Sequence, residues 1–129
     1  MTASRLLEPV KDPDAAHPVA SGWRPVLAAV VRAFVRDDFE LAAGVPTVAA
    51  PTKALAAQLR ANVAAYGETL TELTEETWET SVAQWAGRRW EVLVDLRTVE
   101  AGRSDLVLHV DVEAAADGHR FRIHLIYVP

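Results

Sequence analysis

The C-terminal third of the chain alternates between apolar and polar side chains with a period of two residues. The alternation runs through RRWEVLVDLRT at 88–98 and again through 105–113 and 120–128. A period of two is typical of a strand with one face on a core, so the pattern predicts three long strands. Residues 80–85 are a further predicted strand, and the Thr-rich residues 69–73 are another strand candidate. The expected inward-facing side chains are Trp90, Val92, Val94, Leu96, Leu106, Leu108, Val110, Val112, Phe121, Ile123, Leu125 and Tyr127.

Two earlier segments have the spacing of helices. Residues 24–37 place a broad apolar stripe on one side, with Phe34 in its middle and Pro25 in the first turn, where a missing N–H costs nothing. A second, narrower stripe begins near residues 51–52 and ends before Gly67. Phe34 is therefore expected to be a core residue.

Together these elements predict an α+β fold. We expect two N-terminal helices packed on one face of a curved antiparallel sheet of four to five strands, connected as a meander. Residues 1–20 carry Pro9, Pro13 and Pro18 without any periodicity, which predicts a mobile N-terminal arm or an extended lead-in. Residues 21–129 then form a single domain, and removal of the arm should shift the melting temperature by less than a few degrees.

The turn between the last two strands decides which outward side chains meet. A two-residue turn at 117–118 is the strongest hairpin signal in the chain, and it would place Asp111 opposite His124. A slip of two residues keeps every side chain on its face, because side chains alternate with a period of two. That slipped register needs a four-residue loop, and it would pair Asp111 with Arg122 and His109 with His124.

Composition narrows the class of protein. The chain has 129 residues, of which 50% are hydrophobic and 24% charged, as in an ordinary globular domain. It has no cysteine, which excludes disulfides and thiol chemistry and fits a reducing cytoplasm. A net charge of −5 argues against nucleic-acid binding, and no apolar run is long enough to cross a bilayer. Its basic residues are mostly arginine and alanine is abundant, which hints at a bacterial source.

The outward face of the predicted sheet is the first candidate site. Two histidines beside carboxylates could act as acid and base or bind a metal, so His109, Asp111 and His124 are candidate ligand-binding residues. The interpretation that we favour is a solvated face with cross-strand ion pairs, and no motif such as HExxH supports a metal. We therefore predict no metal and no cofactor. The residues expected on this face are Glu91, Asp95, Arg97, His109, Asp111, Glu113, Arg120, Arg122 and His124.

Tryptophans form the second candidate site. Trp78 and Trp85 could anchor a partner or a ligand, whereas Trp90 belongs to the inward set. A loop centred on residues 87–88 would pair Trp85 with Trp90 on one face. A three-residue loop with a bulge would send the two rings to opposite faces, and the pattern leaves both possibilities open.

An acidic stretch is the third candidate site. Residues 61–87 contain no Lys or Arg, and an acidic patch flanked by tryptophan could capture a basic partner. The simpler interpretation is a solvated surface that keeps the protein soluble. The acidic side chains of this stretch are Glu68, Glu72, Glu75, Glu76 and Glu79.

Two stretches resemble known families. VVRAFVRDDFELAAG, residues 30–44, is similar to the opening helix of nuclear-transport-factor-2-like cone folds, and the order of elements also resembles cystatin-like folds. WETSVAQWAGRRWEVLVDLRTVEAGRSDLVL, residues 78–108, resembles an uncharacterised family of small bacterial proteins that carry a domain of unknown function. The first likeness implies a cone-shaped fold, and the second implies no activity.

No enzyme motif is present: the sequence has no phosphate-binding GxxxxGK, no GxGxxG and no GxSxG. We therefore expect a non-catalytic protein-binding module of the cytoplasm, of the immunity or inhibitor type, whose acidic stretch would suit a basic partner. The alternative is a cone-fold small-molecule-binding or enzyme domain with a pocket between helices and sheet. The sequence leaves open a monomer or a homodimer joined through the sheet.

Overall fold

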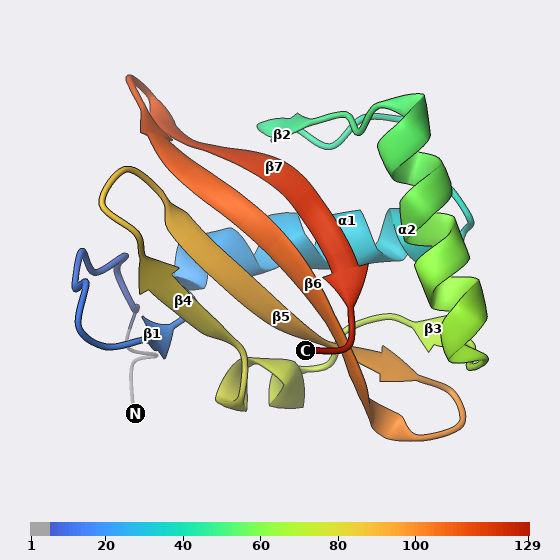
Figure 1. Ribbon diagram of the computed structural model, residues 1–129. Coiled ribbons are helices and arrows are strands. Elements are labelled where there is room, and N and C mark those ends of the chain that lie inside the picture. Colours follow the sequence, from blue (N-terminus) through green and yellow to red (C-terminus); the bar gives the residue numbers. More distant parts are fainter. Residues whose placement is uncertain (1–5) are drawn as a thin grey trace, which may run out of the picture.

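A seven-stranded sheet forms the centre of the structure, a computed structural model that describes residues 6–129 (Figure 1). The strand order is β1-β4-β5-β6-β7-β2, and β3 pairs with the far end of β5. All pairs are antiparallel except β2 with β7, which run parallel. The strands are β1 His17–Pro18, β2 Val48–Ala49, β3 Leu70–Thr71, β4 Val82–Trp85, β5 Trp90–Thr98, β6 Gly102–Ala115 and β7 Gly118–Tyr127.

The α+β class is confirmed. The observed sheet has more strands than expected, and it is mixed instead of purely antiparallel. The meander β4–β5–β6–β7 is the predicted four-stranded part. Three two-residue strands extend it, and the parallel β2 makes the sheet mixed. β3 lies inside the strand candidate 69–73. β1 and β2 are too short to show a period in the sequence, so the pattern does not predict them.

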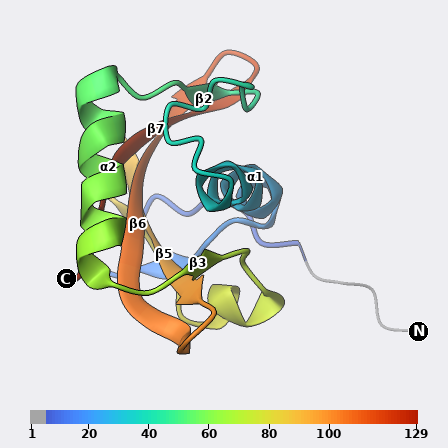
Figure 2. The ribbon, with the colours of Figure 1, turned by 90° about the vertical axis from the view of Figure 1, so that its right-hand side faces the viewer.

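Helix α1, Arg24–Val35, lies across the back of the sheet and packs its apolar stripe on the core (Figures 1 and 2). Pro25 stands in its first turn as expected. Phe34 is 2% exposed and stacks on Phe39 at 5.0 Å, so its prediction as a core residue is confirmed.

Helix α2, Lys53–Tyr66, begins and ends where the sequence predicts. The Thr52 hydroxyl accepts a hydrogen bond from the Leu55 N–H at 3.1 Å, and Gly67 ends the helix at φ 84°. The helix stands beside the β7 edge of the sheet instead of lying next to α1 on the covered face (Figures 1 and 2). Asn62 donates to the Ile126 carbonyl at 2.8 Å, so α2 satisfies part of an edge that β2 leaves unpaired. The expected packing of both helices on one face is therefore corrected. Two short 3-10 helices complete the fold: η1, Ser21–Trp23, and η2, Glu75–Glu79.

The covered face of the sheet carries the inward set of side chains, with one change at the end. Leu125 and Tyr127 were expected inward, but Ile126 is the buried residue there, at 0% exposure. The register between β6 and β7 shifts between His109 and Val110, where β7 has one residue more than its partner strand. Such a bulge reverses the alternation of everything that follows it.

The β6–β7 hairpin adopts the slipped register. From Val110 to Ala115 this is the slipped pairing, with Asp111 opposite Arg122. Ala115 pairs with Gly118, so the loop is the two-residue 116–117 and not the expected four-residue loop. Beyond Val110 the bulge pairs His109 with Leu125, so the His109–His124 pairing of that register does not form. The preferred pairing of Asp111 with His124 was therefore wrong. A slip of two residues preserves both faces, so the apolar pattern could not distinguish the two registers. The β4–β5 hairpin is unambiguous in the structure: Trp85 pairs with Trp90 across a loop centred on 87–88.

Residues 6–20 lie against the body of the protein. β1 pairs with β4 at the sheet edge, and Val19 is fully buried. The Trp90 indole N–H donates to the Val10 carbonyl at 3.0 Å, and Gln84 donates to the Asp12 carbonyl at 3.0 Å. The part of the expected mobile arm that the structure describes thus has specific contacts, while residues 1–5 lie outside the described residues.

Candidate functional site

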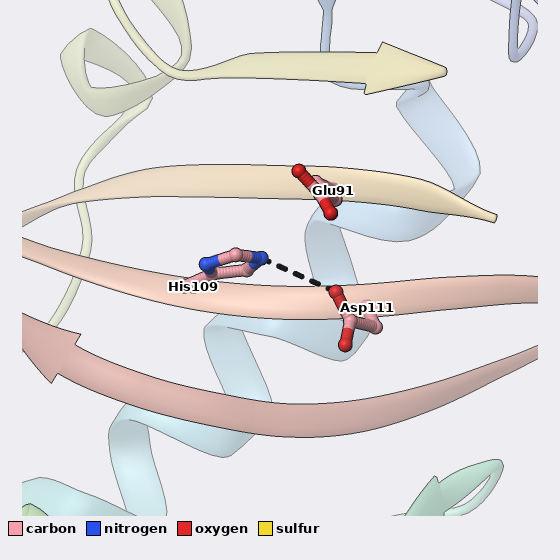
Figure 3. A group of neighbouring side chains, drawn as sticks. All are labelled: Glu91, His109 and Asp111. Atoms are coloured by element: carbon pink, nitrogen blue, oxygen red, sulfur yellow. Dashed lines mark hydrogen bonds and ion pairs between the residues drawn. The ribbon is translucent and has the colours of Figure 1, made fainter. Parts of the chain in front are cut away.

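Three chemically active side chains meet on the uncovered face of the sheet, the face opposite α1 (Figure 3). Glu91 projects from β5, and His109 and Asp111 project from β6. One ligand atom of each residue lies within 4.8 Å of those of the other two. His109 Nε2 and Asp111 Oδ1 are 3.2 Å apart, and these side chains are only 14% and 16% exposed. Cross-strand pairing of Glu91 with Asp111 brings the two carboxylates together.

Arginines balance the charge of this cluster. Arg89 approaches Glu91 at 3.4 Å and Asp111 at 3.5 Å, and Arg122 is the backbone register partner of Asp111 on β7. The Arg89 Nε atom is buried without a hydrogen-bond partner, since its contact with Asp111 is long. The guanidinium therefore neutralises the carboxylates without being fixed by a short bond.

The bulge in β7 places a second imidazole, that of His124, beside His109. His109 is the register partner of Leu125, so His124 is the extra residue between Ile123 and Leu125. The ring centroids of His109 and His124 are 4.4 Å apart. His109, Asp111 and His124, the candidates from the outward face, are thus gathered in one place.

The family comparison covers this whole region. A family model for a domain of unknown function (DUF7668) matches residues 31–129. The chain belongs to this family. No curated protein and no solved structure matches the sequence of this chain significantly. The resemblance of residues 78–108 to a family with a domain of unknown function is confirmed. The bacterial source and the likeness to nuclear-transport-factor-2-like folds stay predictions.

The candidate tryptophans lie outside this cluster. Trp78 is 7% exposed in η2, with the Arg24 guanidinium 5.5 Å above its ring. Trp85 is half-buried beside Trp90, and the Lys11 ammonium lies 5.1 Å from the Trp85 ring. Trp78 is therefore buried under Arg24, whereas Trp85 keeps part of its surface exposed beside Lys11.

The acidic stretch is spread over one end of the molecule. Glu72 pairs with Arg32 at 3.1 Å, while Glu75, Glu76 and Glu79 are exposed in and around η2. Trp78 of η2 is buried, and Trp85 at the end of the stretch is half-buried. The binding of a basic partner by these glutamates stays a prediction.

The sequence did not single out two features of the uncovered face. Glu91 is expected on this face, but the sequence does not place it beside His109 and Asp111. That placement depends on the register between β5 and β6, which the apolar pattern leaves open. Apolar side chains also lie there at half-buried positions, and the bulge in β7 decides part of their placement. They are Val82, Leu93, Leu125 and Tyr127.

Two carboxyl groups elsewhere have shifted pKa values. The hydrogen bond from His17 lowers the pKa of Asp12, and the Thr69 N–H and hydroxyl lower that of Glu100. Both pairs tie segments to the margins of the sheet. No helix in the described part of the chain has the length and apolar composition needed to cross a membrane.

Proposed function

We propose that this protein is a non-catalytic binding module that recognises a protein partner through the uncovered face of its sheet. The observation that carries the proposal is the mixed character of that face. Val82, Leu93 and Leu125 stand in one cross-strand row with His109. Glu91, Asp111 and Arg122 lie on one side of this row, and Asp95, Val107 and Tyr127 on the other. An apolar centre with a polar rim is the usual anatomy of a protein–protein interface.

The packed interior supports binding over small-molecule chemistry. Side chains of α1, α2 and the long strands fill the space behind the sheet, with Leu27, Leu59 and Leu108 all at 0% exposure. Two hollows of about 380 Å³ each, one between the N-terminal segment and Trp23 and one between α2 and Tyr127, are open to the surface. A ligand pocket of an enzyme normally encloses most of its ligand, so a cone-fold pocket receives no support from these hollows.

The charges of the face define the partner. Glu91, Asp111 and Glu113 alternate with arginines, among them Arg89 and Arg122, so neither sign dominates. A complementary partner would present an apolar patch bordered by charges of both signs. A basic partner, as the acidic stretch suggests, would bind at η2 instead.

Paired surface variants test the proposal. Tagged protein would be used to recover partners from its native lysate, comparing the parent with Leu125→Glu on the uncovered face. Glu75→Gln with Glu76→Gln on η2 is the matched control, because it changes exposed charge at a different surface. We expect a stoichiometric partner that Leu125→Glu loses and the η2 variant retains. Thermal melts would verify that both variants remain folded.

Three results would contradict this assignment. Recovery of no stoichiometric partner would remove the binding function, and loss of the partner only in the η2 variant would move the site to the acidic end. Light scattering that shows a dimer, abolished by Leu125→Glu, would assign the face to self-association.

A further inference from the structure

We propose that Glu91, His109 and Asp111 form a binding site for a divalent transition-metal ion such as Zn²⁺, with His124 as a fourth ligand. This inference goes beyond the proposed binding function and does not depend on it, because a metal site on the sheet requires no partner. It rests on the three-residue cluster and on the bulge that places His124 beside it.

The spacing of the ligand atoms suits one small ion. Zinc lies about 2.0–2.2 Å from nitrogen and oxygen ligands, so two ligands of a tetrahedral site are separated by roughly 3.3 Å. The distance from His109 Nε2 to Asp111 Oδ1 is 3.2 Å. The three ligand atoms already lie within 4.8 Å of one another, so side-chain rotation alone could close them on an ion.

The ligand types select the class of metal. Imidazole nitrogen with carboxylate oxygen suits zinc and its neighbours, whereas Mg²⁺ and Ca²⁺ prefer oxygen ligands alone. Glu91, His109 and Asp111 project from paired strands, whose backbones are held by the sheet. His124 is exposed, and its ring lies 4.4 Å from that of His109, so it can turn toward the same ion.

Arg89 is the competitor that the ion must displace. Its guanidinium occupies the space beside both carboxylates, at 3.4 Å from Glu91 and 3.5 Å from Asp111. Its pair with Glu91 is exposed on both sides, at 42% and 39%, and exposed pairs of that kind are weak. Its contact with Asp111, which is 16% exposed, is long at 3.5 Å. Displacement of Arg89 into solvent should therefore reduce metal affinity without preventing binding.

The N-terminal segment supplies a natural control. His17 and Asp12 also form a histidine–aspartate pair, 2.8 Å apart. Among the described residues, however, no third potential ligand completes a cluster there. If a histidine–carboxylate pair alone attracted metal, both places would bind alike.

Titration of the full chain with Zn²⁺ alone, followed by calorimetry and by NMR of the histidine rings, tests the site. We expect one ion per chain with a dissociation constant below about 100 µM, and shifts in the ring signals of His109 and His124 but not of His17. His109→Gln, Asp111→Asn and Glu91→Gln should each weaken binding by about tenfold or more, while His17→Gln should leave it unchanged. Absorption bands of bound Co²⁺ would report the geometry.

Arg89→Gln gives a test with the opposite sign. Removal of the competitor should tighten Zn²⁺ binding by roughly two- to fivefold, the factor expected from weak exposed ion pairs. Because this variant gains affinity, its result cannot be attributed to misfolding. The proposal is overturned if the parent and Arg89→Gln both fail to bind Zn²⁺ below about 100 µM, or if His17→Gln loses as much affinity as His109→Gln.

Discussion

The two faces of the sheet differ in how strictly their residues are constrained. On the covered face, Val92, Val94 and Leu96 follow one another at 0% exposure beneath α1. On the uncovered face of the same strand, Glu91, Leu93 and Asp95 are all half-buried and chemically unlike one another. The covered face must fill space with apolar groups, whereas the other face only has to be compatible with water. The uncovered face is therefore where the chain can place chemistry without loss of its fold.

The same substitution on the two faces of β5 should have its largest effect on the covered side. Leu96→Ala removes a fully buried side chain and leaves a cavity that the packed core cannot fill. We expect a loss of about 3–4 kcal/mol in the free energy of unfolding, measured by urea denaturation. A loss below about 1 kcal/mol would show that the core behind β5 is loosely packed.

Much of the covered face follows from the sequence alone. The alternation of β5 and β6 specifies their buried residues because a one-residue slip would expose the whole set. The ends of α2 follow from Thr52 and Gly67, whose capping chemistry is local. The uncovered site does not follow, because it requires the register of two hairpins. Two registers that differ by two residues put the same apolar side chains on the same face, so the alternation does not distinguish them.

The bulge in β7 was beyond sequence analysis for another reason. Leu125 and Ile126 are both large and apolar, so either could face the core. The structure buries Ile126 and leaves Leu125 beside His109. The bulge also places His124 beside His109, which makes it the detail on which the proposed metal site most depends.

Deletion of residues 1–16 tests whether the N-terminal segment completes the covered side. Composition predicts a shift of less than a few degrees. The contacts predict more, because the buried Trp90 indole N–H would lose its acceptor, the Val10 carbonyl. We expect a loss of about 2–3 kcal/mol, or roughly 8–12 °C in melting temperature by calorimetry. A shift under a few degrees would support the original expectation of a mobile arm.

Leu93→Ala is the counterpart of Leu96→Ala on the uncovered face. Leu93 is half-buried between Val82 and His109, and water can enter the space that its truncation leaves. We expect a loss of about 1 kcal/mol under the same denaturation conditions. Equal effects of the two substitutions would mean that the uncovered face is buried in solution, for instance by a second copy of the chain.

The smallest effect concerns the contact between Asp12 and His17 within the N-terminal segment. The hydrogen bond from His17, followed by that from the Asp14 N–H, lowers the pKa of Asp12 in the folded protein. A carboxyl whose pKa is lower in the folded state stabilises the fold above its unfolded pKa, near pH 4, and loses that contribution as the pH falls through the folded pKa. Asp12→Asn should therefore melt slightly below the parent at pH 7, and the two should converge as the pH falls through the lowered pKa of Asp12 in the folded protein. Melting curves between pH 2 and pH 7, on the order of one per pH unit, measure this difference. A gap that persists at the lowest pH would show that Asp12 acts through packing and not through its charge.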